Sequence, residues 1–421
     1  WVTHAAKPPA AGDKNLGGEI PSDLVKVDDT HVFWPRNTEY EIFSVGLKRH
    51  TLGAVFVLGH REVFTEGVPP VRPVAARARA EGALLDLDKH SWPWAMALPA
   101  LMSVDLYELS NNHMWRTEFG FSSWTPAAPP HLLPPYGGDK GGEREWIHYT
   151  LGNYYTLLNC GFNMRPTAGN ANGVHPVPLG FGRVYVRLPE GFSYEAWKSG
   201  LNAGRSFVTT GPMLFAQVNE RDPGFAIEAQ PGDKLQVSGE IISEQPLTFG
   251  EIIHNGAPVQ VLRAQNKRTA TGAYATEFTA EVEVQSSGWL AVRCWEDRPG
   301  GRVRYAHTAP WHVKIPGRPL LAPPHDRAQL VTRMRDEIER SRGVLPAAAI
   351  AEYEEALAAY ERVPVSDDAE SIRATARPPE DEAELHHLLG TVYQQQRNYD
   401  GAVSEFREAL RIEPSMHETL F

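Results

Sequence analysis

Short apolar runs that end in polar clusters dominate the first half of the chain. Four such runs, with their polar ends, span 53–62, 82–92, 104–113 and 165–175. Buried parallel strands read as short apolar runs, and in βα folds the working side chains follow the strand ends. Helix-like segments at 71–81 and 192–204 separate the runs. Strand, helix, strand order predicts an α/β domain with a mostly parallel sheet over residues 1–205, with a site assembled from several strand ends.

The pattern changes after residue 205. About seven short segments with alternating apolar and polar positions follow at regular spacing between 206 and 316. Turn residues separate them, including Asn255-Gly256 and the Pro-Gly-Gly at 299–301. This spacing is typical of a β-sandwich. We therefore predict an independent antiparallel sandwich over 206–316, packed on the edge of the α/β domain and containing no helix longer than two turns.

The last part of the chain is helical after a linker at 317–324. Helices are predicted at 326–342 and 346–362, and two more within 382–412. The segment at about 382–415 resembles a tetratricopeptide repeat (TPR) in the spacing of Leu389, Gly390, Tyr393, Ala402, Phe406, Ala409 and Pro414. One repeat cannot bury its own face. Within a helical segment over 325–421, we expect it to stack on the two preceding helices or on further repeats; a lone helical unit is the alternative.

Composition narrows the classes of partner. The net charge of −11 and the pI of about 5.8 lack the basic footprint of nucleic-acid binding, and no apolar run approaches membrane-spanning length. Cys160 and Cys294 are interpreted as two buried apolar side chains rather than a disulfide. The chain starts at Trp1 without a leader pattern, so these features leave the compartment unknown.

Five motifs carry a second resemblance. They are Asn-Thr-Glu39-Tyr, the run from Gly82 to His90, Asp-x-x-Glu-x-x-Asn over 105–111, the segment from Thr167 to His175, and Gly-Arg-Ser-Phe at 204–207. Together they resemble the polymerase-and-histidinol-phosphatase (PHP) superfamily of metallohydrolases, in its carbaryl hydrolase-like branch, over about residues 25–315. The resemblance implies an incomplete PHP-type (β/α) barrel, a divalent metal (zinc, manganese or iron), and a bacterial, periplasmic or secreted hydrolase.

The chain departs from that family in two respects. The His-x-His strand and the following Asp-His strand of the superfamily are missing, since His4 and His31 are isolated. Ala171 stands about where a metal-binding aspartate is expected. Either the N-terminal third of the barrel has been cut off, which we expect, or the site is degenerate. In both cases we predict weak or partial metal binding and little activity.

Candidate site residues follow from the strand ends and the resemblance. As metal ligands we predict His90, His175, His60 and Glu39, with Glu41 as the fallback for Glu39. His113 is the candidate proton donor, and Asp88 either orients His90 or binds metal itself. Glu108 and Asn111 are expected to brace the site by hydrogen bonds, and Arg116 and Arg183 to hold an anionic substrate group. A structural histidine, strand acid or loop residue is the alternative at each position.

Three functions remain open at this point. The first is a metal-dependent hydrolase of phosphoester, amide or carbamate bonds in a small-molecule substrate, in which a bound metal activates water. The second is a non-catalytic glycan- or protein-binding module in which the TPR segment docks a protein partner. A structural scaffold that uses only the repeat is the third and least specific possibility.

Overall fold

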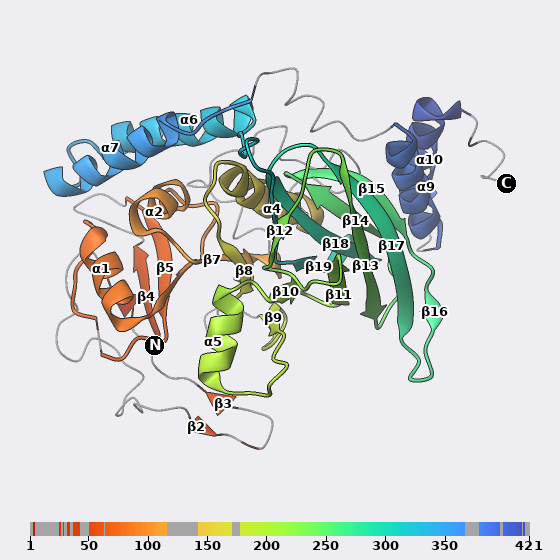
Figure 1. Cartoon of the computed structure of the whole chain (residues 1–421), viewed down its shortest axis with the longest axis horizontal. Coiled ribbons are helices and arrows are strands. Elements are labelled where there is room, and N and C mark those ends of the chain that lie inside the picture. The colour runs from red at the N-terminus through yellow and green to blue at the C-terminus, as the bar shows by residue number, and fades with distance from the viewer. Residues whose placement is uncertain are drawn as a thin grey trace.

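The chain combines an α/β sheet, a two-sheet sandwich and two helical hairpins (Figure 1). The computed structural model describes residues 3–4, 25–26, 28, 32–33, 37–42, 50–62, 64–115, 142–170, 177–366, 379–395, 399–414 and 416. No helix among these residues is long and apolar enough to span a bilayer. Cys160 and Cys294 are buried free thiols, as predicted.

The α/β sheet has six strands and is open. Its members, in spatial order, are β1 (Thr3–His4), β4 (Asn37–Ile42), β5 (Gly53–Leu58), β6 (Leu84–Leu87), β7 (Leu106–Ser110) and β8 (Arg165–Ala168). All run parallel except β5, which is antiparallel to both neighbours. Residues 43–52 are too few for a parallel crossover from β4 to β5, which explains the reversal. The predicted barrel is therefore not what the described strands form: they make an open sheet with β1 and β8 as its ends. A separate ribbon pairs β2 (Val25–Lys26) with β3 (Val32–Phe33).

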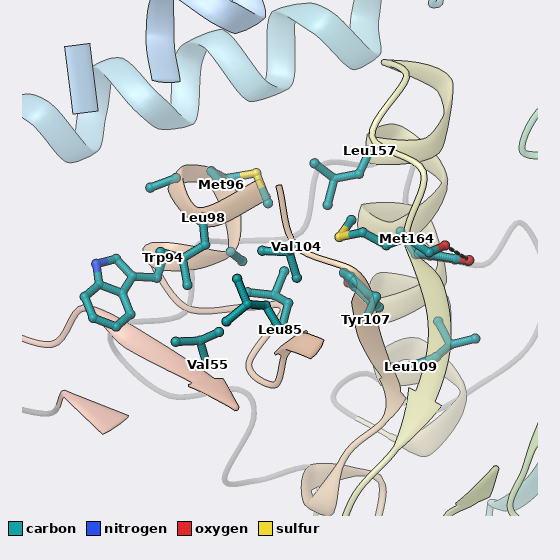
Figure 2. Packing of buried hydrophobic residues seen from close by; sticks show 14 of the residues in the cluster. Val55, Leu85, Trp94, Met96, Leu98, Val104, Tyr107, Leu109, Leu157 and Met164 are labelled. Carbon is teal, nitrogen blue, oxygen red and sulfur yellow. Dashed lines mark hydrogen bonds between the residues drawn. The ribbon is translucent and has the colours of Figure 1, made fainter. Parts of the chain in front are cut away.

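Helices cover one face of this sheet. They are α1 (Arg72–Glu81), α2 (Trp94–Met102) and α4 (Glu143–Asn159). Figure 2 shows Val55, Leu85 and Tyr107 of the strands packing with Leu98 of α2 and Leu157 of α4. Burying one such side chain contributes about 1.5–3 kcal/mol, so this face supplies the core of the α/β region.

Two helices here match their predicted positions, and two were missed. The first match is α1, predicted at 71–81. The second is α5 (Tyr194–Asn202), where Ser193 caps the N-terminus by accepting from the Ala196 N–H at 3.0 Å. Helices α2 and α4 were not predicted. Helix α2 is apolar on all sides because α6 and α7 cover its outer face, and it lacks the amphipathic period that signals a helix.

The sandwich consists of two sheets with an apolar core between them. The larger follows the order β12 (Ala226–Glu228), β20 (Trp311–Lys314), β18 (Gly288–Arg298), β19 (Arg302–Thr308), β10 (Ser206–Thr209) and β9 (Arg183–Val186), and β14 (Phe249–His254) joins β15 (Ala257–Arg263) to β18. The smaller follows β11 (Met213–Val218), β13 (Asp233–Ser243), β17 (Tyr274–Val284) and β16 (Lys267–Arg268). No helix occurs within 206–316, all of which is described.

The sandwich differs from the prediction at its start and in its independence. It begins with β9, about twenty residues before the predicted boundary, because β9 pairs antiparallel with β10. It also shares a core with α4 and the α/β sheet. The Trp289 indole donates to Asn159 of α4 at 2.8 Å, and the Tyr305 hydroxyl donates to the Leu109 carbonyl at 2.8 Å. The sandwich is therefore joined to the α/β sheet through buried polar contacts.

The Asn255-Gly256 turn is confirmed. Both residues have positive φ, 49° and 87°, as a tight hairpin between β14 and β15 requires. The Asn255 side chain accepts from the Trp289 N–H at 2.8 Å, which ties the turn to β18.

The two helical hairpins lie at opposite ends of the molecule in Figure 1. The first, α6 (Pro324–Ser341) with α7 (Ala347–Glu361), packs on α2 and α4. The second, α9 (Pro379–Gln395) with α10 (Tyr399–Ile412), packs through α9 on β15. The expected stacking of the repeat on the preceding helices is therefore wrong, since the sandwich covers it instead. Gly390 allows the close approach of α9 and α10, because a Cβ there would lie 2.5 Å from the Phe406 ring.

Candidate functional site

Five carboxylates lie on the face of the α/β sheet opposite the helices. Strand register aligns Glu39 with Phe56 and Phe56 with Asp86, and it places Glu108 beside Thr167. Side chains two positions apart share a face, so Glu41 and Asp88 join this set. We call Glu39, Glu41, Asp86, Asp88 and Glu108 the carboxylate cluster. All are buried except Glu41, which is half-buried and marks the approach of the cluster to solvent.

Asp88 is the centre of the cluster. The Lys89 ammonium forms an ion pair with it, and both groups are buried. Glu39 and Glu108 each share a hydrogen bond with the Asp88 carboxylate. Within hydrogen-bond reach, two carboxylates are compatible only if one carries a proton. The geometry thus requires protons as well as Lys89 to hold these acids together.

The protonation states follow from burial and from Lys89. Burial raises the pKa of Glu39 and Glu108 well above the usual range, and the charge of Asp88 raises both further. Burial would also raise the pKa of Asp88, but the Lys89 ammonium and a hydrogen bond from Glu108 outweigh it, so this pKa falls below its usual value. The pKa of Asp88 is therefore shifted in the opposite direction from the pKa values of the two glutamic acids that contact it.

Asp86 extends the cluster toward β8. The Thr167 hydroxyl lies 2.9 Å and 2.8 Å from its two carboxylate oxygens. Burial raises the pKa of Asp86 to about 7, and the hydrogen bond from Thr167 opposes that rise. Asp86 is therefore poised to change its charge near neutral pH.

Gly169 leaves room for the Glu108 carboxylate. A Cβ at Gly169 would lie 1.6 Å from Glu108 Oε1. No other residue type fits there without displacing Glu108, which gives the Thr-Ala-Gly segment at the end of β8 a physical role beside the cluster.

His90 is held within an aromatic shell instead of facing the carboxylates. Asn111 Nδ2 lies 3.2 Å from its Nδ1, and the Thr150 hydroxyl lies 3.1 Å from its Nε2. Its ring also packs against Trp146 at 4.7 Å between centroids. Burial lowers the pKa of His90 well below its ordinary value, so the ring is neutral. A metal would have to displace one of these two partners, and the contacts favour the structural alternative.

His60 does not join His90. Because β5 is antiparallel, the residues that follow it lie at the opposite end of the sheet from the residues that follow β6. There His60 Nε2 lies 2.8 Å from the Thr38 hydroxyl, and its ring packs on Phe64. The predicted convergence of His60 with His90 is therefore wrong, since it assumed that β5 runs parallel.

His113 and Asn111 lie beside the cluster on the turn after β7. The short helix η1 (Asn112–Met114) is capped by Asn111, whose Oδ1 accepts from the His113 N–H at 3.0 Å. His113 packs on Trp146 and is close enough to Asp88 to lower the pKa of that carboxyl. Asn111 thus connects His113 and His90, and both histidines are close enough to Asp88 to interact with its charge.

Three predicted residues remain, and only Arg183 is among the described residues. Arg183 is in β9 of the sandwich, where its guanidinium donates to the Gly180 carbonyl at 2.9 Å. His175 and Arg116 lie outside the described residues. The roles predicted for these three stay predictions.

Sequence reasoning missed Lys89 and Asp86. Both stand inside the run Leu-Asp86-Leu-Asp88-Lys89-His90, which was interpreted around its histidine. The available signal was the period-two spacing of the two aspartates, which places both carboxylates on one face of a strand. Lys89 could be recognised as their counter-ion only once the strand end was known.

The described donors do not fit a metal centre. Among the described residues, no three His, Cys, Asp or Glu side chains are placed so that they could hold one metal ion. Both nitrogens of His90 have hydrogen-bond partners, and the Lys89 ammonium lies on Asp88, where a cation would bind. Lys89 supplies the positive charge that the arrangement needs.

Comparison with known proteins identifies only the C-terminal segment. A family model of the tetratricopeptide repeat matches residues 383–416, which are the α9–α10 hairpin and the residues that follow it. No curated protein and no solved structure is significantly similar to the chain. The chain therefore contains a TPR at 383–416, beside an α/β sheet and a sandwich.

Proposed function

We propose that the chain is a hydrolase whose active site is the carboxylate cluster with Lys89 and His113. The observation that carries the proposal is one buried aspartate, Asp88, that is ion-paired with Lys89 and hydrogen-bonded to two buried glutamic acids. Groups with opposed protonation preferences at one place are the arrangement that general acid–base catalysis uses. The substrate class, a phosphoester, amide or carbamate, comes from the resemblance to the PHP superfamily.

Each group has a chemical role in this proposal. Asp88, held ionised by Lys89, accepts a proton from the attacking water. Glu108 holds a proton on the other side of Asp88 and can donate it to a leaving group. His113 is the second candidate donor. Asp86 and Thr167 fix the neighbouring strand and set the charge around Asp88.

A metal belongs to this proposal only through the resemblance. Zinc, manganese or iron, when bound, would activate water and polarise the scissile group. Because the described donors do not fit such an ion, we derive no catalytic step through it. Metal dependence is measured directly, by comparing activity after chelation with activity after addition of each ion.

The test is turnover of simple probes. We expect hydrolysis of p-nitrophenyl phosphate, an aryl N-methylcarbamate or an anilide, lost by at least about 100-fold in both Asp88→Asn and Glu108→Gln. The matched control is Asp326→Asn, because Asp326 is also buried and bonded to Thr156 and Asn159, away from the cluster. Equal activity in the cluster variants and the control would refute the proposal, as would inactivity of the wild type on the whole panel with and without metal.

A second candidate function is docking of a protein through the repeat. The outer surface of α10 exposes Tyr399 and Val403, which are one turn apart and 63% and 47% exposed. Neighbouring repeats normally cover such positions. A photo-crosslinking residue at 399, in cells that express the chain, should capture one recurrent protein. The same residue at Phe192, an exposed aromatic far from the repeat, should not; equal capture at both sites would reject docking at α10.

A further inference from the structure

A second concave site lies in the sandwich, away from the carboxylate cluster. It is a cavity of about 530 Å³ between β9 and β10 of the larger sheet and β11 and β13 of the smaller one. Strands β9 and β11 are the outermost strands of their sheets, so the cavity lies at an edge of the sandwich (Figure 1). This volume is within the range that proteins use for small ligands.

Three aromatic rings form its wall. Tyr185 and Phe207 are stacked, with 5.2 Å between centroids and 12° between planes. Phe215 packs edge-on against Phe207, with 5.8 Å between ring centroids. Phe207 is buried, but Tyr185 and Phe215 are 39% and 48% exposed. Large apolar rings held at a cavity instead of in the core indicate a surface that a ligand covers.

Polar groups complete the lining. The Asp222 carboxylate is fixed by an ion pair with Arg187 and by the Gln217 amide at 3.1 Å. Ser206 does not offer its hydroxyl to the cavity, because it pairs with Val186 on the face of the sheet opposite Phe207 and Tyr185.

The charges that line the cavity cancel. The two positive charges of Arg187 and Arg205 are balanced by the two negative charges of Asp222 and Glu240. The lining contains no other ionisable acid or base apart from Tyr185. A charged ligand would meet as much repulsion as attraction. A wholly apolar ligand would cover the Asp222–Arg187 ion pair and the Gln217 amide without offering them a hydrogen bond, which is unfavourable when they are desolvated.

We propose that this cavity binds a neutral saccharide. Sugar rings have an apolar C–H face that stacks on an aromatic ring and hydroxyl groups that pair with carboxylate, guanidinium and amide side chains. Phe215 and Tyr185 supply the aromatic surface, and Asp222, Arg187 and Gln217 supply the hydroxyl partners. The proposal assigns the cavity to binding without chemistry, and it does not depend on the hydrolase proposal.

The experiment is calorimetric titration of the full chain with neutral hexasaccharides of glucose (α- and β-linked), mannose, xylose and N-acetylglucosamine. We expect at least one to bind, and Phe215→Ala and Asp222→Ala each to weaken that binding by at least tenfold. Phe192→Ala is the matched control, since Phe192 is 56% exposed and outside the lining, and it should bind as the wild type does. Circular dichroism confirms that each variant is folded.

Three results would overturn the proposal. The first is that no hexasaccharide binds. The second is binding that Phe215→Ala leaves unchanged, because the sugar would then lie elsewhere. The third is binding of laurate, a purely apolar probe, that Phe215→Ala abolishes while every sugar fails, since the cavity would then hold an acyl chain. Hydrolase activity is not a readout here, so failure of either proposal is distinguishable from failure of the other.

Discussion

Buried charges are arranged differently in the sandwich and in the α/β sheet. In the sandwich, Glu251 is fully buried and matched by one arginine, with Arg293 Nε at 2.7 Å and the Trp295 indole at 2.9 Å from its Oε2. Arg144 and Asp297 form a second buried pair at the boundary with α4. In the α/β sheet, by contrast, the Lys89 ammonium interacts with four of the five carboxylates of the cluster, Asp88, Glu39, Glu108 and Glu41.

The difference separates structural charges from candidate catalytic ones. A buried pair with satisfied hydrogen bonds holds the fold but has no proton to exchange near neutral pH. A buried excess of acids must hold protons, and it is less stable than a neutral or paired alternative. Proteins keep such arrangements at functional sites. The predictions below test this distinction, from the largest expected effect to the smallest.

The largest effect on stability is expected for the buried Arg293–Glu251 pair of the sandwich. Arg293→Ala leaves Glu251 buried without its arginine, which should lower the free energy of unfolding by about 3–5 kcal/mol. Urea denaturation measures the loss. Arg335→Ala is the control, since its pair with Glu361 is solvent-exposed and should be worth about 0–1 kcal/mol. Similar losses in the two variants would show that the buried pair is not structural.

At Asp86, in contrast, we expect a substitution to raise the free energy of unfolding. Its pKa is raised from 3.8 to about 7 in the folded chain. The unfolded chain therefore ionises first, and stability falls as the pH rises from about 4 to about 7. Neutral Asp86→Asn removes that loss, so the variant should be more stable than the wild type at pH 8 by on the order of 2–4 kcal/mol. Urea midpoints at pH 5 and pH 8 test it; a variant that is less stable at pH 8 would contradict an unfavourable buried charge.

Gly169→Ala tests the geometry of the cluster directly. The added Cβ must displace the Glu108 carboxylate. This overpacking should lower the free energy of unfolding by about 1–3 kcal/mol. The double variant with Glu108→Ala should recover most of that loss, because the displaced group is then absent. A double-mutant cycle of thermal melts measures this coupling. Additive losses would mean that Gly169 and Glu108 do not meet.

The sequence predicted elements well and contacts poorly. The Asn255-Gly256 turn, the Ser193 cap and the repeat at 383–416 were predictable because each depends on a few neighbouring residues. The direction of β5 was missed, because the short spacing between β4 and β5 signals a reversal only once both strands are known to be neighbours in one sheet. One reversed strand moved His60 to the opposite end of the sheet from His90.

The candidate site shows the same limit. The acids Glu39, Asp88 and Glu108 were identified from pattern and resemblance, and the structure brings them together on one face of the sheet, with Glu39 and Glu108 inside their strands instead of at the strand ends. Lys89 and Asp86 were overlooked, because a counter-ion is defined by what surrounds it in space. The aromatic cavity was also missed, since β9 to β13 contribute its wall from segments that show no shared motif.

The smallest effect concerns His90 and separates the structural alternative from the metal-ligand prediction. His90→Gln keeps an amide that can pair with Asn111 or Thr150 but not with both as the ring does, so we expect a loss of about 1 kcal/mol at pH 7. Burial lowers the pKa of His90 in the folded chain. The unfolded chain therefore takes up the proton first, and the stability that neutral His90 contributes to the folded chain is lost as the pH falls below about 6.5. The variant should approach the wild type in stability at pH 5.

Elemental analysis of both proteins, each incubated with zinc, manganese or iron, completes the test. We expect equal metal content, because the ring nitrogens are already bonded within the protein. Loss of stoichiometric metal on His90→Gln would restore His90 as a ligand, and it would place the cation of the active site at the end of β6 in place of Lys89.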